Sequence, residues 1–270
     1  MAITLRSSRE LQMLRMAGAV VAKVLLKLTE YARPGVTTAR LDELASEMTR
    51  QAEAVALFKG VTGPYGTRPF PGAICASINE QLVHGIPSEK VVLKDGDLLS
   101  IDFGARLDGY CGDAAVTLGI GQVSAAGRKL IDTTMRLLDI AIENIAPGVK
   151  WSFVAAKMEA CAKQAGFSVV RDYVGHGIGT EMHEDPKLPN FVSEELLRND
   201  IVLREGMILA VEPMVNMGRS AVRTLPDGWT VVTRDARPSA HFEHTIAVTK
   251  DGCEVLTENS TRSQKSENSE

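Results

Sequence analysis

The sequence predicts an α+β fold in which two similar helical units surround a largely antiparallel sheet. Three observations lead to this prediction. Apolar residues recur at helical spacing in four segments, and short segments rich in branched and aromatic residues follow each pair. A Pro-Gly-Val break also divides each helical unit, at Pro34 and again 113 residues later at Pro147. An internal duplication accounts for this repeat, although Pro-Gly-Val is also a common linker between helices.

The helical units are predicted from the apolar spacing and from their capping residues. In the first unit a helix covers Glu10–Tyr31, and Thr37 and Thr38 offer hydroxyl groups to cap the helix after the break. In the second unit a helix covers Ser124–Asn144. After the break, Ser152 can cap the next helix, which extends through Gly166.

The segments of β type are short and are bounded by Gly, Pro or Asp. They are Val91–Val92, Leu98–Phe103, Tyr110–Leu118, Met207–Val215, Trp229–Val232 and His241–Val248. Residues 1–257 are therefore expected to form a single domain. Residues 258–270 contain no hydrophobic side chain and are expected to form a disordered polar tail.

The composition excludes several functional classes. The chain has 30 basic and 34 acidic residues, a formal net charge of -4 and no basic block, so no nucleic-acid or anionic-lipid partner is expected. Apolar runs are too short to cross a membrane, and the first residues lack a hydrophobic signal region. The 4 cysteines are far apart and form no CxxC pair, which indicates reduced thiols and a cytoplasmic protein.

A predicted hairpin brings two aspartates to one face of the sheet. Asp108-Gly109 is the favoured pair for a type I′ turn, so the strand pairing can be counted back from it. Asp102 and Asp113 then become diagonal neighbours. Apolar-flanked carboxylates repel each other unless a cation lies between them, and no Lys or Arg is nearby on that face. A divalent metal is the simplest partner, although two solvated aspartates would give the same pattern.

Three further residues have side chains that suit metal ligands. Glu212 and Glu243 lie within apolar strand sequence, where an acidic residue is seldom buried unless it is paired or bound to metal. His176 lies between glycines in YVGHGIGTEMHEDP, which suits a histidine presented from a tight turn, and His183 follows in the same segment. An edge-strand glutamate that points to solvent is the alternative for each carboxylate.

These four carboxylates and one imidazole fit a centre of two divalent metal ions. Four negative charges balance two divalent cations, which leaves an internal site close to neutral. Such a donor set favours manganese, iron, cobalt or zinc over a cysteine-bound structural zinc. Two metals that share a water lower its pKa toward neutrality, so the set predicts hydrolytic chemistry.

The five residues also resemble the ligand set of a known enzyme family. With their flanking sequence they are Asp102 in IDFG, Asp113 in GYCGDAA, His176 in GHGIG, Glu212 in VEP and Glu243 in FEHT. In this order and context they resemble the methionine aminopeptidases, which have the pita-bread fold. The resemblance extends from about Ile3 to Thr257 and includes the segments SINEQLVHGIP and DGWTV. The pseudo-twofold duplication of that fold agrees with the Pro-Gly-Val repeat.

The resemblance implies a role for each ligand in a dinuclear site. Asp102 binds one metal, Asp113 and Glu243 bridge the two metals, and His176 and Glu212 bind the other. The activity implied is metal-dependent removal of the N-terminal methionine from peptides and nascent proteins whose second residue is small. A hydroxide activated by both metals would attack the carbonyl of the first peptide bond.

The resemblance implies catalytic roles for three side chains. Glu212 would carry the proton, His183 would stabilise the tetrahedral oxyanion, and His84 would contact the scissile nitrogen or the substrate backbone. A purely structural role is the alternative for His84 and His183. His241 and His244 have no catalytic role by this resemblance, and we expect them behind the ligands or at the surface.

A pocket for the methionine side chain is implied near Phe70, Cys75, Met182 and Trp229, with Tyr65 as a further candidate. Apolar and sulfur-bearing walls suit a thioether. The sequence departs from the family pattern at Met182, where many relatives have an aromatic residue. It also departs in the segment VTGPYGTRPFPG.

Spacing favours the short bacterial type I group of this family. Glu243 follows Glu212 by only 31 positions, which leaves no room for the helical insertion of the second type, and no zinc-finger extension is expected before the catalytic region. The resemblance implies a monomer that acts on nascent chains at the ribosome. One alternative is another pita-bread enzyme, such as a proline dipeptidase, an aminopeptidase that cleaves before proline, or creatinase. A second is an inactive binding module, which would be expected to have lost ligands.

Overall fold

The computed structural model describes residues 3–63 and 66–258, and it confirms the predicted α+β class. The helices of these residues are α1 (Ser8–Tyr31), α2 (Thr38–Gln51), α3 (Ala125–Asn144), α4 (Trp151–Ala165) and α5 (Glu194–Arg198). The strands are β1 (Val55–Ala56), β2 (Cys75–Ile78), β3 (Gln81–Val83), β4 (Leu98–Leu107), β5 (Tyr110–Gly119), β6 (Ser168–Val169), β7 (Gly175–Gly177), β8 (Glu184–Leu188), β9 (Ile208–Val211), β10 (Met214–Asn216), β11 (Val222–Thr224), β12 (Val231–Thr233), β13 (Ser239–His241), β14 (Glu243–Thr249) and β15 (Gly252–Val255). Tyr65 and nearly all of the predicted tail lie outside the described residues.

The strands form one large sheet and two small ones. The large sheet has the order β1-β4-β5-β14-β9-β7-β8, with β2 also paired to β4 and β15 also paired to β14. The small sheets have the orders β13-β10-β6 and β11-β12-β3. All the strand pairs are antiparallel within the described residues, as the sequence predicts.

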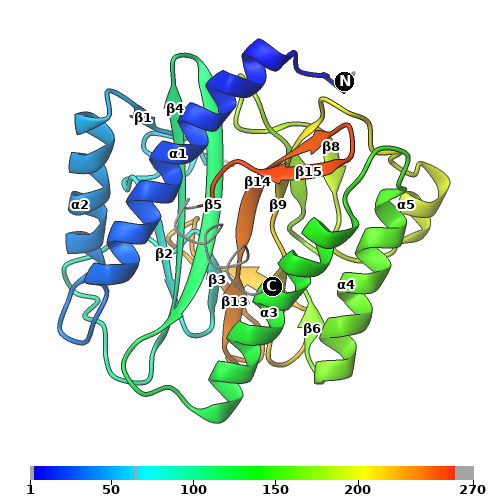
Figure 1. Ribbon diagram of the computed structural model, residues 1–270. Helices are drawn as coiled ribbons and strands as arrows, with labels where there is room; N and C mark the ends of the chain where they lie inside the picture. Colours follow the sequence, from blue (N-terminus) through cyan, green and yellow to red (C-terminus); the bar gives the residue numbers. More distant parts are fainter. Residues whose placement is uncertain (1–2, 64–65, 259–270) are drawn as a thin grey trace, which may run out of the picture.

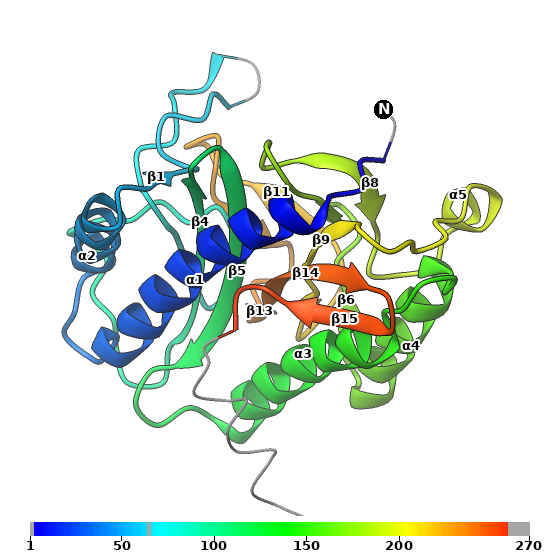
Figure 2. The ribbon, with the colours of Figure 1, turned by 45° about the horizontal axis from the view of Figure 1, so that its top comes forward.

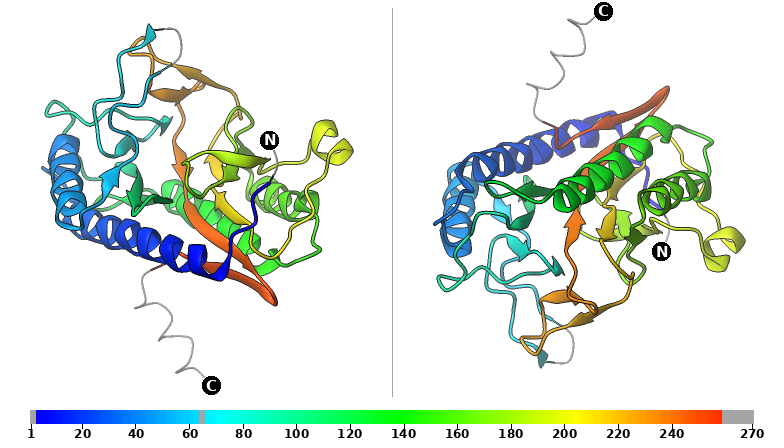
Figure 3. Two further views of the ribbon diagram at one scale, coloured as in Figure 1. Left: turned by 90° about the horizontal axis from the view of Figure 1, so that it is seen from above. Right: turned by 90° about the horizontal axis from the view of Figure 1, so that it is seen from below.

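The long helices cover one side of the large sheet. Helices α1 and α3 run across it, with α2 and α4 outside them (Figures 1 and 2). Both views in Figure 3 place the orange strands β11 and β12 and the cyan segment that follows β1 on the side away from α1. Along β4, Leu99, Ile101 and Phe103 pack in one core with residues of α1 and α2. Alternation along the strand therefore directs the residues between them to the other side of the sheet.

The internal duplication is visible as matching hydrogen bonds. The N–H of Gly35 donates to Leu93 at 2.9 Å in the first half, and the N–H of Gly148 donates to Leu203 at 2.8 Å in the second. An isolated bridge follows each break, Thr37 with Val92 and Lys150 with Val202. The repeat also continues into the strands, because VVLKDGDLLSID over 91–102 aligns with IVLREGMILAVE over 201–212. This alignment places Asp102 on Glu212, so the two halves present acidic residues at equivalent positions.

Each helix pair has its own hydrophobic core. Val21, Leu28 and Leu41 lie in the core under α1 and α2, whereas Trp151 and Met158 lie in the core under α3 and α4. In the described residues, no helix combines the length and apolarity that crossing a membrane requires.

Of the two helix caps that the sequence predicts, one is confirmed and one is wrong. Thr37 caps α2 through its side-chain oxygen, as predicted. Ser7 and Ser124, for which the sequence predicts no cap, cap α1 and α3, and α1 begins at Ser8 rather than at Glu10. The prediction that Ser152 caps the fourth helix is wrong, because α4 already begins at Trp151 and its N-cap Lys150 makes no side-chain cap bond. The start of α4 is fixed by the β-bridge between Lys150 and Val202 and by the buried indole of Trp151. The Ser152 hydroxyl instead bonds a carboxylate oxygen of Asp200 at 2.6 Å.

Three predicted strands differ from the structure by more than a shift of their ends. Val91–Val92 forms only a single bridge rather than a strand. The segment Met207–Val215 is divided into β9 and β10, because Pro213 has no N–H to continue the ladder. The segment His241–Val248 is likewise divided at Phe242 into β13 and β14, which belong to different sheets.

Candidate metal centre

Five neighbouring strands present the predicted ligands next to one another. In the order of the sheet, the ligands lie on β4 (Asp102), on β5 (Asp113), at the start of β14 (Glu243), directly after β9 (Glu212) and on β7 (His176). Ala115 of β5 pairs with Asp102 on one side and with Glu243 on the other. The small side chain at 115 therefore lies between two carboxylate-bearing strands.

The hairpin has the register that its turn predicts. Asp108 and Gly109 both have positive φ, at 48° and 84°, and Leu107 pairs with Tyr110. Gly104 then pairs with Asp113. A β-carbon on this glycine would lie 3.1 Å from Asp113 Oδ1, so the glycine leaves room for the carboxylate.

Close backbone packing holds His176 in place. A β-carbon at Gly175 would collide with the Ala210 carbonyl, and one at Gly177 would collide with the Asp185 carbonyl. The ring Nδ1 lies 2.9 Å from the Gly177 carbonyl oxygen, which leaves Nε2 to face the site. This nitrogen lies 3.4 Å from Glu212 Oε1.

The ligand atoms form a tight cluster. One atom each of Asp113, His176 and Glu243 lies within 4.8 Å of the other two. Glu212 joins the cluster through its contact with His176, and Asp102 lines the same cavity. The structure therefore brings all five predicted ligands together.

Burial leaves these carboxylates short of partners. Asp113 and Glu243 are 4% and 3% exposed, and one oxygen each of Asp102, Asp113 and Glu243 has no hydrogen-bond partner in the described residues. Burial raises the pKa of Asp102 to about 7. Burial and the neighbouring Asp102 raise the pKa of Asp113 well above its ordinary value. Burial and the nearby aspartates also raise the pKa of Glu212 and of Glu243.

Among the residues that the structure describes, the site has no fixed positive charge that could balance the carboxylates. None of the described residues that line the cavity is a lysine or an arginine. Buried carboxylates must then be protonated or bound to a cation. Unpaired carboxylate oxygens beside one imidazole fit a divalent metal.

Two further predicted residues, His84 and His183, line the cavity beside the cluster. The rings of His176 and His183 lie 4.4 Å apart between centroids, and the ring of His84 contacts that of Tyr173 at 5.6 Å. Burial lowers the pKa of His84 and of His176 to about 4, and it also lowers the pKa of His183. Near neutral pH these rings are therefore uncharged, and each can donate one hydrogen bond.

The apolar end of the cavity contains the four described residues of the predicted methionine pocket. They are Phe70, Cys75, Met182 and Trp229. The rings of Phe70 and Trp229 meet edge to face at 5.2 Å, and the indole N–H donates to the Arg68 carbonyl at 2.7 Å. The whole cavity has a volume of about 200 Å³.

The structure adds residues to the cavity that the sequence did not assign to it. They are Phe58, Val61, Val83, Tyr173, Met214 and His241. Two of them had a signal in the sequence. Tyr173 begins the segment that contains His176, and His241 precedes Glu243 by two positions, the spacing of residues on one face of a strand. His241 is buried and lines the cavity, while His244 contacts Thr257 at 2.9 Å.

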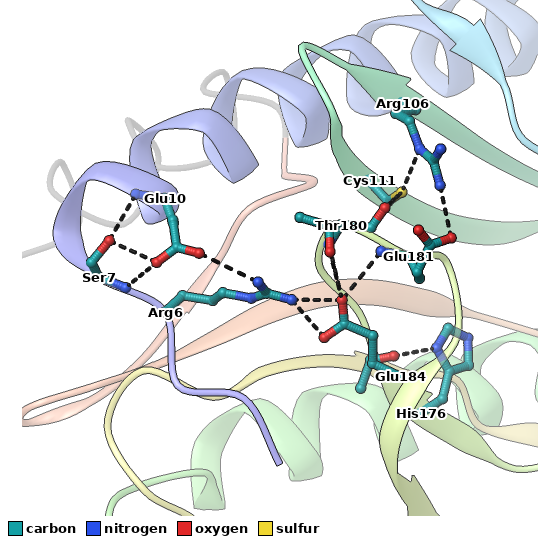
Figure 4. A network of polar contacts seen from close by, with 10 residues as sticks. Arg6, Ser7, Glu10, Arg106, Cys111, His176, Thr180, Glu181 and Glu184 are labelled. Carbon is teal, nitrogen blue, oxygen red and sulfur yellow. Dashed lines mark hydrogen bonds and ion pairs between the residues drawn. The ribbon is translucent and has the colours of Figure 1, made fainter. Parts of the chain in front are cut away.

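A polar network anchors the loop that carries Met182 and His183 (Figure 4). Nη2 of Arg6 lies 2.5 and 2.6 Å from the two carboxylate oxygens of Glu184. Glu184 Oε1 also accepts the backbone N–H of Thr180 at 2.9 Å. The segment before α1 therefore connects to the loop around the cavity through one ion pair.

Comparison with known proteins first identifies the class. Residues 12–250 match the family described as "Metallopeptidase family M24". The chain is 43% identical over 255 residues to methionine aminopeptidase 1 of Bacillus subtilis, and the match covers 94% of this chain and 99% of that protein. The chain therefore belongs to metallopeptidase family M24 and, within it, to the methionine aminopeptidases.

Solved structures agree with this assignment. The methionine aminopeptidase of Thermotoga maritima superposes with a TM-score of 0.89 at 40% identity, covering 96% of this chain and 100% of that one. The prolidase of Pyrococcus furiosus has a TM-score of 0.73 at 20% identity, and the match covers 94% of this chain and 65% of that one. The second likeness shows the pita-bread fold alone. Membership of a metallopeptidase family also implies a divalent metal cofactor, which the unpaired carboxylates of the cavity fit.

Proposed function

We propose that this protein releases the N-terminal methionine from peptides and nascent proteins whose second residue is small. The observation that carries the proposal is the convergence of all five candidate ligands, from five neighbouring strands, on one cavity with an apolar end. The single catalytic domain covers residues 1–257. The protein works as a monomer in the cytoplasm, on chains that emerge from the ribosome.

The candidate ligands would hold two divalent ions, which we expect to be manganese, iron, cobalt or zinc. Asp102 would bind one ion, His176 and Glu212 the other, and Asp113 and Glu243 both. When bound, such ions polarise the scissile carbonyl and lower the pKa of a shared water. The unpaired oxygens of Asp102, Asp113 and Glu243 support this assignment, because buried carboxylate oxygens need a partner.

Three side chains would handle the proton and the substrate during hydrolysis. The attacking water forms the new C–O bond and loses a proton to Glu212, which passes it to the amine released when the C–N bond breaks. The neutral ring of His183 donates a hydrogen bond to the carbonyl oxygen as negative charge develops on it. The neutral ring of His84 contacts the scissile nitrogen or the substrate backbone.

Selection for methionine would come from the apolar end of the cavity. Phe70 and Trp229 form an edge-to-face wall, and Cys75 and Met182 add sulfur atoms that suit a thioether. A small second residue of the substrate is what the resemblance to the methionine aminopeptidases implies. The prolidase shares only the fold, so no preference for proline is proposed.

A paired peptide assay tests this function. The purified protein is stripped with a chelator, supplied with manganese, iron, cobalt or zinc, and incubated with Met-Ala-Ser and with Ala-Pro peptides. We expect methionine release after metal addition and no cleavage of Ala-Pro. If none of the four metals restores methionine release, the proposal is refuted. The alternative that this chain is an inactive binding module is disfavoured because all five candidate ligands are present. The same assay tests this alternative, since an inactive module would release no methionine.

A further inference from the structure

His241 is a buried histidine for which the proposed mechanism has no use. Its side chain lines the cavity of the metal centre, and the residue is 2% exposed. Neither ring nitrogen has a hydrogen-bond partner among the described residues. Because buried polar atoms are almost always paired, an unpaired imidazole in this cavity indicates a contact that forms when the site is loaded.

The ring faces two candidate ligands at the same time. His241 Nε2 lies 3.9 Å from Glu212 Oε2 and 3.9 Å from Glu243 Oε2. Both separations are too long for a hydrogen bond, and each can be closed by a small rotation of a glutamate side chain. The other oxygen of Glu212 faces His176 at 3.4 Å, so its carboxylate lies between two imidazoles.

The backbone at this position is held from both sides. The Thr117 hydroxyl lies 2.8 Å from the N–H of His241 and 2.8 Å from its carbonyl oxygen. The same hydroxyl lies 2.8 Å from the hydroxyl of Ser100. His241 also pairs with Met214, the first residue of β10 and the second after Glu212. The backbone that carries the imidazole is therefore held in place, and the two glutamate side chains can be oriented against the ring.

We propose that His241 is a positioning residue whose ring N–H holds the carboxylate of Glu212 or of Glu243 in the orientation that binds metal. The inference rests on the proposed function, because it needs these glutamates to be ligands. A neutral imidazole has one N–H, which can bond the outer oxygen of either carboxylate while the inner oxygen faces the metal. Outer partners of this kind typically change metal affinity by about 10–100-fold.

Two substitutions at this position separate the hydrogen bond from the volume of the ring. His241→Gln keeps a neutral donor, and His241→Leu fills a similar volume without any polar atom. Calorimetric titration of the metal-free proteins with manganese should show affinity about 10–100-fold weaker for His241→Leu. The affinity of His241→Gln should stay within about 3-fold of the wild type, because the donor is retained.

Thermal melting without metal shows whether a weaker affinity comes from misfolding. We expect His241→Leu to melt at or above the wild-type temperature, because it replaces an unpaired buried polar group with an apolar one of similar size. His244→Leu is the matched control. That ring contacts Thr257, and its loss should leave manganese affinity unchanged.

The outcomes distinguish this inference from the function on which it rests. The positioning role of His241 would be overturned if a folded His241→Leu protein bound manganese with wild-type affinity. It would also be overturned if the Gln and Leu variants lost manganese affinity equally. If the wild-type protein itself takes up no metal, the proposed metal centre fails first and the inference fails with it. Weak binding by Leu together with near-normal binding by Gln would support the positioning role.

Discussion

Arg6, two residues before α1, forms an ion pair with Glu184, the residue that follows His183. The two side chains are only 8% and 18% exposed, and the pair connects segments 178 residues apart in the sequence. A carboxylate oxygen of Glu184 also accepts the N–H groups of Thr180 and Glu181. Through these bonds Arg6 holds the turn that presents His183 to the cavity.

Replacing Arg6 with alanine should therefore reduce both stability and turnover. A charged hydrogen bond in a mostly buried pair contributes about 1–3 kcal/mol to the free energy of unfolding. Displacement of His183 by a fraction of an ångström should lower kcat by about 10-fold or more, with a smaller effect on KM. Chemical denaturation and steady-state kinetics measure the two effects.

The exposed pair between Arg15 and Glu254 provides a matched control. Its side chains are 43% and 36% exposed, and it lies outside the residues that line the cavity. Arg15→Ala should cost less than about 1 kcal/mol and leave kcat unchanged. Wild-type kcat in Arg6→Ala would show that the turn does not depend on this ion pair.

The stability of the metal-free protein should fall as the pH rises from 7 to 8. Burial raises the pKa of Asp102 to about 7 and the pKa of Asp113, Glu212 and Glu243 well above the ordinary range. In the unfolded chain these groups ionise near pH 4, so above that pH the folded state binds more protons. Stability contributed by the protonated carboxyls is lost as the pH rises through the folded pKa values.

This pH window avoids the opposite effect of the histidines. Burial lowers the pKa of His84 and His176 to about 4, so their contribution to stability increases with pH but is complete by about pH 7. Denaturant titrations in a chelating buffer at pH 7 and pH 8 measure the remaining change. Bound metal should remove most of the dependence, since it stabilises the charged carboxylates. Equal stability at both pH values without metal would contradict the prediction.

Asp113→Asn should abolish activity by removing a proposed bridge between the metals. Because outer partners of metal ligands already contribute about 10–100-fold, the loss of a ligand should lower kcat/KM by more than about 100-fold. Metal titration of the variant should also show fewer tight sites. Asp132→Asn, the same change at an exposed position of α3, serves as the control and should leave both measurements unaltered.

Where the structure agrees with the sequence at the candidate site, the signal in the sequence is local geometry. One Asp-Gly turn set the register of β4 and β5, and the structure pairs Gly104 with Asp113 as counted from it. The glycines beside His176 gave a second local signal, because each is a point of close backbone approach. Convergence of the remaining ligands needed the family resemblance, since nothing local shows that β14 lies between β5 and β9.

What the sequence could not show depends on contacts between distant segments. Pro213 indicated a strand end, but not that the chain would pass from β9 into a different sheet. That change of sheet carries β13, and with it His241, to the cavity. The same limit applies to Ser152, because the start of α4 is fixed by pairing with a segment some 50 residues later rather than by a cap.

Cys75→Leu should narrow the apolar end of the cavity and weaken selection for methionine. The cysteine is 4% exposed, packs with Phe58 and Phe70, and pairs with Asp102 across β2 and β4. A longer branched side chain here occupies the space proposed for the thioether, and mismatches of about one methylene in such pockets change kcat/KM by about 10–200-fold. We expect kcat/KM for Met-Ala-Ser to fall within this range while manganese affinity stays near that of the wild type. Cys75→Ala, which enlarges the pocket, should retain most of the activity, and full activity in Cys75→Leu would place the methionine side chain elsewhere.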